Sequence, residues 1–377
     1  MTASALFRTL RVATAPAILL LATACGSAGG GAEAEQQPAP QADASGVTQN
    51  APWALKTREH VDLWLHGFAM LVDDTARVPW FRRGYRDQMV VLKNRANVTT
   101  MLDANRDRLR ARFGTNRLLP IQGQFLALYA DDWNDLVEAA QLFLQAEGNP
   151  QRANSQQAAT AIALFAQTFP AAADREWLRL FMQSLDDERQ KYYHGYWLSE
   201  QRARDATLAA IDSSWHRVHR PRLQGFLNNS RQASGSVLLS LPIGGEGRTI
   251  ATGGAGSIAT VTFPETRAAA DEAIYVFVHE AVGQLAASAV GDNVTPNERR
   301  EGLADRLQAA AAVRTGYMVL ARVDPALAPG YAEFYLRAAN APRTSGTVES
   351  RLAAAFPLPS TIADAIGRQL DVVLGGI

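Results

Sequence analysis

The chain has 377 residues, 37 basic and 37 acidic side chains, six His and one Cys, so its formal charge at pH 7 is zero. This balance argues against a protein that binds nucleic acid through a strong basic field, and we expect no nucleic-acid partner. A single Cys leaves no intramolecular disulfide, no Cys-based zinc module and no iron–sulfur cluster. The content of 20% charged and 47% hydrophobic residues indicates a folded, soluble body rather than a disordered chain.

The first residues have the pattern of a secretory signal. Two Arg precede an apolar run over residues 12–24, which is shorter than the ~20 residues that a membrane-spanning helix needs. The sequence LATAC at 21–25 resembles a bacterial lipobox. The resemblance implies that residues 1–24 form a lipoprotein signal peptide and that Cys25 carries the lipid. The alternative is an ordinary signal peptide with an incidental Cys.

Lipidation at Cys25 would make the membrane a partner of this protein and place it in the bacterial cell envelope. No Asp occupies the second position after the cleavage point. By resemblance to Gram-negative lipoproteins, this favours the outer membrane over the inner one. Residues 25–51 are of low complexity and show no apolar period, so we interpret them as a tether.

The body of the chain changes its pattern near residue 230. Residues 52–230 place apolar side chains at three- and four-residue steps, as in LWLHGFAMLV and AIALFAQTF, which predicts a helical region of six to eight helices. Residues 231–377 begin with VLLSLPI, RTIAT and SIATVTF, separated by Gly clusters, which predict two or three strands. The Gly clusters lack the form of a phosphate-binding loop.

Helical patterns return after the predicted strands. An apolar stripe predicts one helix over about 266–289 with Thr266 as its N-cap, and another helix starts at Asn297. Three shorter helical segments follow at 331–340, 349–356 and 361–374. The expected fold is therefore α+β and mostly α-helical, with an N-terminal helical region followed by a small sheet and a helical C-terminal region.

A His–Glu pair lies in the middle of the predicted 266–289 helix. In zinc peptidases the motif His-Glu-x-x-His places two His one helical turn apart, and the Glu activates a zinc-bound water. Here His279 and Glu280 are present, but Gly283 stands where the second His would be. The motif is therefore half complete.

The order of strands, a long helix with His-Glu, a loop and a helix that opens with Glu-Gly-Leu-Ala-Asp resembles the gluzincin metallopeptidases. The resemblance spans about residues 237–314 and implies a zincin-like α+β region over 231–377. It implies that His279 and Glu301 are zinc ligands and that Glu280 is the general base. Asp305 would hydrogen-bond His279 from behind. The alternative is a core His, a surface Glu and an acid favoured by a helix N-terminus.

The vacant position at Gly283 bears on metal binding. Catalytic zinc normally has three protein ligands and one open position, so two ligands leave a deficit in zinc affinity. His216 and His219 are spaced at i, i+3 and could contribute a metal site, although such a pair on an Arg-rich helix is usually a solvated face. Zinc is thus the one cofactor that the resemblance implies.

Two functional hypotheses follow. The first is a lipid-anchored envelope protein on a metallopeptidase-like scaffold with impaired metal binding, which binds a peptide or protein ligand or acts as a scaffold. The second is an active zinc-dependent peptidase with Glu280 as general base and an unconventional second ligand. A helical lipoprotein without a site, which binds an envelope partner, is a third interpretation. The gluzincin resemblance requires the side chains of His279 and Glu301 to converge.

Overall fold

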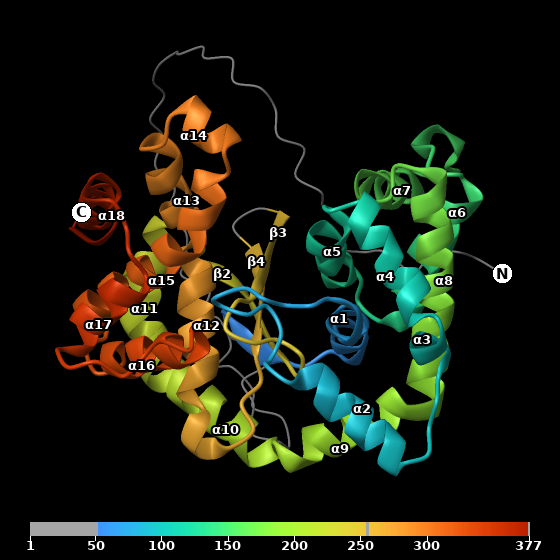
Figure 1. The fold of residues 1–377 in the computed structure, drawn as a ribbon, viewed down its shortest axis with the longest axis horizontal. Coiled ribbons are helices and arrows are strands. Elements are labelled where there is room, and N and C mark those ends of the chain that lie inside the picture. The colour runs from blue at the N-terminus through green and yellow to red at the C-terminus, as the bar shows by residue number, and fades with distance from the viewer. Residues whose placement is uncertain (1–51, 254–255, 376–377) are drawn as a thin grey trace, which may run out of the picture.

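The computed structural model describes residues 52–253 and 256–375. The fold is mostly α-helical with one small sheet, which confirms the predicted α+β class. The sheet lies in the middle, with one group of helices on either side (Figure 1). The predicted signal peptide, the tether with Cys25, and Gly254 and Ala255 of the second Gly cluster lie outside the described residues.

The N-terminal group of helices, called the helical unit below, has a hydrophobic core of its own. Trp64, Phe68 and Phe181 are fully buried in it, and Leu238 and Ile250 of the sheet pack into the same core. A 3-10 turn, η1 (Gly123–Tyr129), adds to it. In chain order its helices are α1 (Glu59–Leu71), α2 (Tyr85–Arg95), α3 (Met101–Ala104), α4 (Arg106–Thr115), α5 (Leu119–Gln122), α6 (Trp133–Gln145), α7 (Gln156–Thr168) and α8 (Ala172–Glu188).

A nearly continuous helical path then leads away from the helical unit. It is interrupted by two π-helical segments, which are often found at functional sites. Helix α9 is the only α-helix of eight or more residues in the described chain for which no residue is buried. The path consists of the π segment η3 (Arg189–Tyr193), α9 (His194–Ala203), α10 (Asp205–Ser214), the π segment η4 (Trp215–His219) and α11 (Arg220–Asn229).

The sheet has the strand order β1-β2-β4-β3. The strands are β1 (Ala54–Lys56), β2 (Ser234–Ser240), β3 (Arg248–Gly253) and β4 (Gly256–Thr262). The sequence predicted two or three strands in this stretch, and all three apolar runs form strands, β2, β3 and β4. Strand β1 is an additional strand that pairs in parallel with β2. Strands β2 and β4 are also parallel, and β3 pairs antiparallel with β4.

Side chains of β2 alternate between two cores. Val237 and Leu239 pack into the second core, whereas Leu238 between them packs into the core of the helical unit. This is the period of two that a strand buried on both faces requires. The sheet thus separates the two hydrophobic cores and is shared by both.

The second core belongs to the C-terminal unit, which consists of α10, α11 and the helices that follow the sheet. It includes Trp215 and Phe226, although both lie before the pattern change at residue 230. The later helices are α12 (Asp271–Ala281), α13 (Gly283–Asp292), α14 (Pro296–Arg300), α15 (Leu303–Val323), α16 (Ala328–Ala338), α17 (Val348–Ala355) and α18 (Ser360–Gly375).

The helix predicted over 266–289 is formed by three consecutive segments. Thr266 is the N-cap of a short 3-10 turn, η5 (Arg267–Ala269), and α12 and α13 follow with a break at Val282. Among the described residues, the stretch Arg267–Asp292 is the one helical segment long and apolar enough to cross a membrane, but 61% of its apolar window is buried inside the protein. This burial is typical of the core helix of a folded domain.

Candidate functional site

His279 and Glu280 lie at the C-terminal end of α12, which packs against β4, α15 and α16. His279 is 5% exposed, and its ring stacks on the Tyr335 ring at a centroid distance of 5.4 Å and an interplanar angle of 22°. The Nδ1 atom of His279 is 3.1 Å from Oε1 of Glu280. The two side chains of the half motif are therefore in direct contact.

Both oxygens of Glu280 are engaged by strand β3 and the residue before it. The Gly247 backbone N–H donates to Oε1 at 3.0 Å, and the Thr249 hydroxyl donates to Oε2 at 3.1 Å. Burial raises the pKa of Glu280, but the hydrogen bond from His279, together with the Arg248 charge and the Thr249 hydrogen bond, outweighs it and leaves the pKa below its ordinary value. Glu280 is thus an ionised carboxylate that fastens α12 to β3.

This contact selects the tautomer of the neutral His279 ring. An ionised carboxylate only accepts hydrogen bonds, so Nδ1 of His279 carries the proton that points at Glu280. In the neutral ring Nε2 then has a free lone pair. Nε2 is buried and has no hydrogen-bond partner among the described residues. A buried polar atom without a partner is costly, so Nε2 is an atom of the half motif to which the described fold gives no partner.

Further charged groups lie next to the Glu280 contact. Arg248 is buried, donates from Nε to the side-chain Oε1 of Gln124 at 2.7 Å and lies 5.0 Å from the centroid of the Trp80 ring. Burial raises the pKa of Glu246, and the nearby charge of Arg248 opposes that rise. Glu246 and Glu280 are two carboxyl groups whose pKa values are pushed in opposite directions, a pattern typical of acid–base sites.

Helices α13 and α15 determine where the downstream acids lie. The Gln308 side-chain amide donates to the Gly283 carbonyl at 3.4 Å, and the Arg299 guanidinium donates to the Gly291 carbonyl at 2.8 Å. Residue numbers rise along one segment as they fall along the other, so the two segments are antiparallel. Extending this pairing back to His279 places it beside approximately residue 312 of α15, and not beside residue 301.

The structure consequently does not bring the predicted ligands together. Glu301 is exposed at the C-terminal end of α14, and Asp305 is exposed in the first turn of α15, whereas His279 is buried on α12. Within residues 52–253 and 256–375, no three His, Cys, Asp or Glu side chains gather where they could hold a metal ion. The residues in place do not fit a three-ligand zinc site.

The position of the missing second His is open. A Cβ atom built on Gly283 meets no atom within 4 Å outside its own helix and its neighbours. Thus no His or acid from the described chain enters the space that the substitution by Gly leaves. The vacancy inferred from the motif is present as open space beside the helix.

The other predicted His pair behaves differently from a solvated face. His219 is 8% exposed, and its Nδ1 atom is 2.6 Å from the fully buried carboxylate of Asp324. His216 lies 3.5 Å from Asp212. The solvated-face interpretation is wrong for His219, because the π-helical turn η4 directs its ring toward the end of α15 rather than to solvent.

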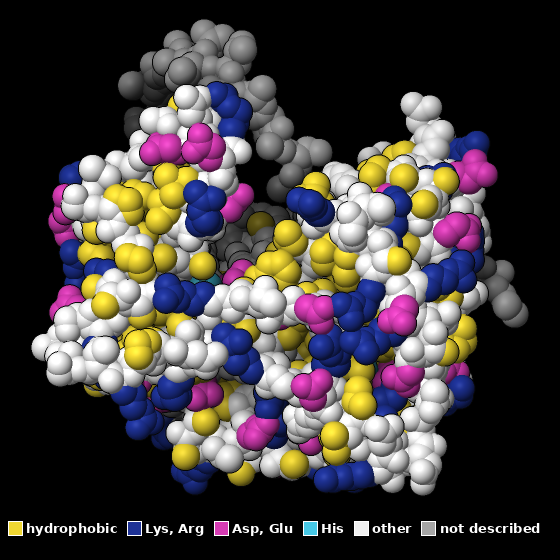
Figure 2. All heavy atoms as spheres, viewed as in Figure 1, with side chains coloured by type: hydrophobic (Ala, Val, Ile, Leu, Met, Phe, Trp, Pro, Cys, Tyr) yellow, Lys and Arg dark blue, Asp and Glu magenta, His cyan; other side chains and the backbone are white. Residues whose placement is uncertain are grey.

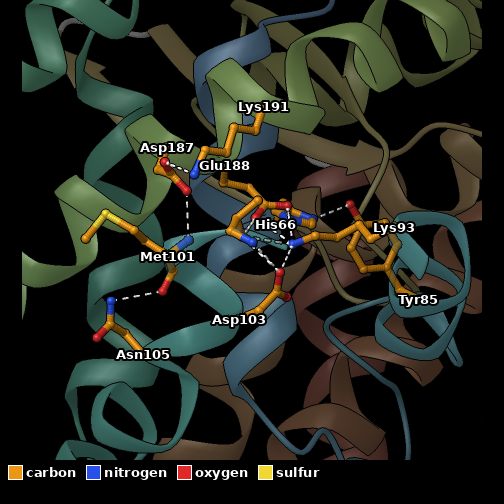
Figure 3. Close-up of polar contacts among 10 residues, drawn as sticks. His66, Tyr85, Lys93, Met101, Asp103, Asn105, Asp187, Glu188 and Lys191 are labelled. Carbon is orange, nitrogen blue, oxygen red and sulfur yellow. Dashed lines mark hydrogen bonds and ion pairs between the residues drawn. The ribbon is translucent and has the colours of Figure 1, made fainter. Parts of the chain in front are cut away.

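A second polar cluster inside the helical unit escaped the sequence reasoning. Glu188 is fully buried and accepts hydrogen bonds from Lys93 Nζ at 2.7 and 3.0 Å and from His66 Nε2 at 3.2 Å. His66 Nδ1 is 3.0 Å from the Tyr85 hydroxyl, and Lys93 is 2.6 Å from Asp103 (Figure 3). The one sequence signal for this cluster was the rarity of Lys, because the chain has only three Lys and Lys93 is one of them.

Comparison of the chain with protein-family models, with curated proteins and with solved structures gives no match in any of the three.

Proposed function

We propose that this protein is a lipid-anchored envelope protein that binds an extended peptide or protein segment on a metallopeptidase-like scaffold without metal-dependent hydrolysis. The observation that carries this proposal is the state of Glu280. Its two oxygens accept hydrogen bonds from Gly247, Thr249 and His279, which hold the carboxylate against β3 rather than free to activate a water. Glu280 instead stabilises strand β3.

Strand β3 supplies the binding surface in this proposal. It is an edge strand, because β4 is its one partner in the sheet. The Phe263 N–H donates to the Ser240 carbonyl of β2, so alternate residues of β4, including Thr260 and Ile258, point toward β3. Thr260 and Ile258 pair with Arg248 and Ile250 of β3. Thr249 and Ala251 alternate with these residues, so the backbone N–H and C=O groups of Thr249 and Ala251 point away from β4.

This free edge is accessible. Ala251 is exposed. The β3–β4 hairpin rises between α13 and α5 (Figure 1), and the same face is hollowed between these two sides (Figure 2). An extended segment can add to an exposed sheet edge through main-chain hydrogen bonds, with its side chains supplying specificity.

The binding experiment uses fluorescein-labelled β-casein, an unstructured chain, as the probe. We expect its fluorescence anisotropy to rise with the full-length protein while the casein stays intact on a gel. Ala251→Pro removes the outward N–H and should weaken binding about tenfold, an order of magnitude expected from losing a main-chain hydrogen bond. Ala251→Val keeps that N–H and should bind as the wild type. Equal binding by all three proteins, or no binding, contradicts the proposal.

One observation favours an active zinc-dependent peptidase as the second candidate. Nε2 of His279 is buried and unpartnered, as a metal-ligand nitrogen is before its ion binds. Chelator-sensitive cleavage of the casein that is abolished by Glu280→Gln would establish this candidate and overturn the first. Intact casein in the presence of added zinc supports the binding role.

The lipid anchor has its own test. In a bacterial host, the wild type should fractionate with the membrane and incorporate labelled palmitate, and Cys25→Ser should do neither. Retention of Cys25→Ser in the membrane fraction would contradict the anchor while leaving the binding proposal standing.

A further inference from the structure

A buried carboxyl group lies where the helical unit, the sheet and helix α9 meet. Asp62 on α1 is 1% exposed, and the Trp197 indole N–H of α9 donates to its Oδ2 at 2.9 Å. Within the described chain no Lys, Arg or His lies within ion-pair distance of Asp62. Asp62 is thus a buried acid that has hydrogen-bonding neighbours but no direct counter-ion.

The groups around Asp62 come from every element packed against it. Half of them are hydroxyl groups, which stabilise a carboxylate less than a cation does. The buried Arg204 is committed to Glu200 at 2.7 Å and to the Phe263 carbonyl at 2.7 Å. The titratable and polar groups facing this region are His66 on α1, which contacts Tyr85, Arg82 before α2, Tyr85 at the start of α2, Tyr193 on η3, Tyr196 and Glu200 on α9, Arg204 after α9, and Ser240 at the end of β2.

Helix α9 is the cover of Asp62 that is least costly to displace. Ser240 belongs to a central strand, and Tyr85 and Tyr193 are buried in the core of the helical unit. In contrast, α9 has no buried residue, and Trp197 is half-buried between the two cores. Segments with few buried contacts open locally before the rest of the fold.

We propose that Asp62 and Trp197 form a proton-controlled latch, in which loss of the Asp62 proton releases α9 and loosens the connection between the helical unit and the C-terminal unit. A protonated Asp62 fits the buried position. An ionised Asp62 favours any state that admits water to its carboxylate. Of these states, the displacement of α9 has the lowest free-energy cost, because α9 has no buried residue.

The direction and pH range follow from linkage. Burial raises the pKa of Asp62 to about 7 in the closed state, and hydrogen bonds from Ser240 and Trp197 offset only part of this rise. In the open state the carboxyl group has an ordinary pKa of ~3.9. The closed state therefore binds the proton more tightly. Opening of α9 increases about tenfold per pH unit between pH ~4 and pH 7 and levels off above it.

Hydrogen–deuterium exchange of the full chain, corrected for the intrinsic pH dependence of exchange, tests the latch. We expect the protection factors of α9 amides to fall about a hundredfold from pH 5 to pH 7. Amides of α6, on the far side of the helical unit, should keep their protection. In Asp62→Asn, α9 should have the same protection factors at both pH values.

Three results would overturn the latch. The first is that the protection factors of α9 in the wild type do not change with pH. The second is an equal fall of these protection factors in Asp62→Asn, which would assign the effect to another group. The third is an equal fall of the protection factors of α6 and α9, which would indicate a global loss of stability. Trp197→Phe provides a second variant should Asp62→Asn fail to fold. It removes the indole N–H that donates to Oδ2 of Asp62 at 2.9 Å and should steepen the pH effect on α9 relative to the wild type. The test needs no peptide, so it is independent of the proposed binding function.

Discussion

The buried pair of Lys93 and Glu188 allows a quantitative test of what holds the helical unit together. Lys93 on α2 and Glu188 at the end of α8 are 2% and 0% exposed, and their charged atoms are 2.7 Å apart. Lys93→Met would leave Glu188 buried with His66 and the Thr100 hydroxyl as its remaining neighbours. Removing one partner of a buried pair costs about 3–5 kcal/mol, because the other charge stays uncompensated.

The pKa of Glu188 gives an independent magnitude. Burial raises this pKa, but His66 and Lys93 more than offset the rise and lower it from 4.5 to about 2. At 1.36 kcal/mol per pH unit, the difference corresponds to about 3 kcal/mol of stability. Because the folded-state pKa is depressed, this contribution is complete above pH ~4.5 and is lost as the pH falls toward 2.

Urea unfolding followed by Trp fluorescence measures both effects. We expect Lys93→Met to lower the free energy of unfolding by about 3–5 kcal/mol at pH 7 and by much less at pH 3. Lys191→Met is the matched control (Figure 3). Lys191 is 2.7 Å from Asp187, but its side chain is 52% exposed, so its loss should cost less than about 1 kcal/mol. Equal, small losses in the two variants would refute the reasoning.

Three further predictions concern α1 and the C-terminal unit. As the pH rises from 4 to 7, the free energy of unfolding of Asp62→Asn should rise relative to that of the wild type by up to about 4 kcal/mol. The reason is that the wild type must then either bury the charge of Asp62 or open. Urea unfolding at several pH values checks this. Gly316→Ala should destabilise the fold by about 1–3 kcal/mol, because the added Cβ would lie within 3 Å of the Tyr331 ring. Gly283→Ala is the control: the added Cβ has open space there, so this variant should be neutral or stabilising. Thermal unfolding of both variants measures the difference. Gly283→His should raise zinc affinity about tenfold or more in competition with a chromophoric chelator, because His279 lies one helical turn away; unchanged affinity would contradict this helix geometry.

Local patterns in the sequence predicted much of the fold. The helix over 266–289 and the three Gly-separated strands follow from three- and four-residue steps and from short apolar runs, which are set by neighbouring residues. Strand β1 has three residues and exists because it pairs with β2, about 180 residues later in the chain. No local period marks such a strand. Similarly, the apolar pattern of α10 and α11 resembles that of the predicted helical region 52–230, but both helices pack into the second core.

The candidate site was only partly predictable, because sequence spacing does not give helix length. The motif places a downstream acid 22 residues after His279, and the gluzincin resemblance needs the chain to turn back soon after that His. Instead, α13 continues to Asp292 before the chain reverses, so Glu301 lies beside the far end of α13. The Lys93 cluster was missed because its members come from α1, α2, α3 and α8, and only the tertiary fold brings them together.

The central claim is that Glu280 fastens α12 to β3 and does not activate water on a metal. The zinc content of the purified full-length protein and of its His279→Ala variant, after incubation with zinc and exhaustive dialysis, tests this claim most directly. We predict substoichiometric zinc that is the same in both proteins. One zinc ion per chain in the wild type that is lost in His279→Ala would contradict the claim.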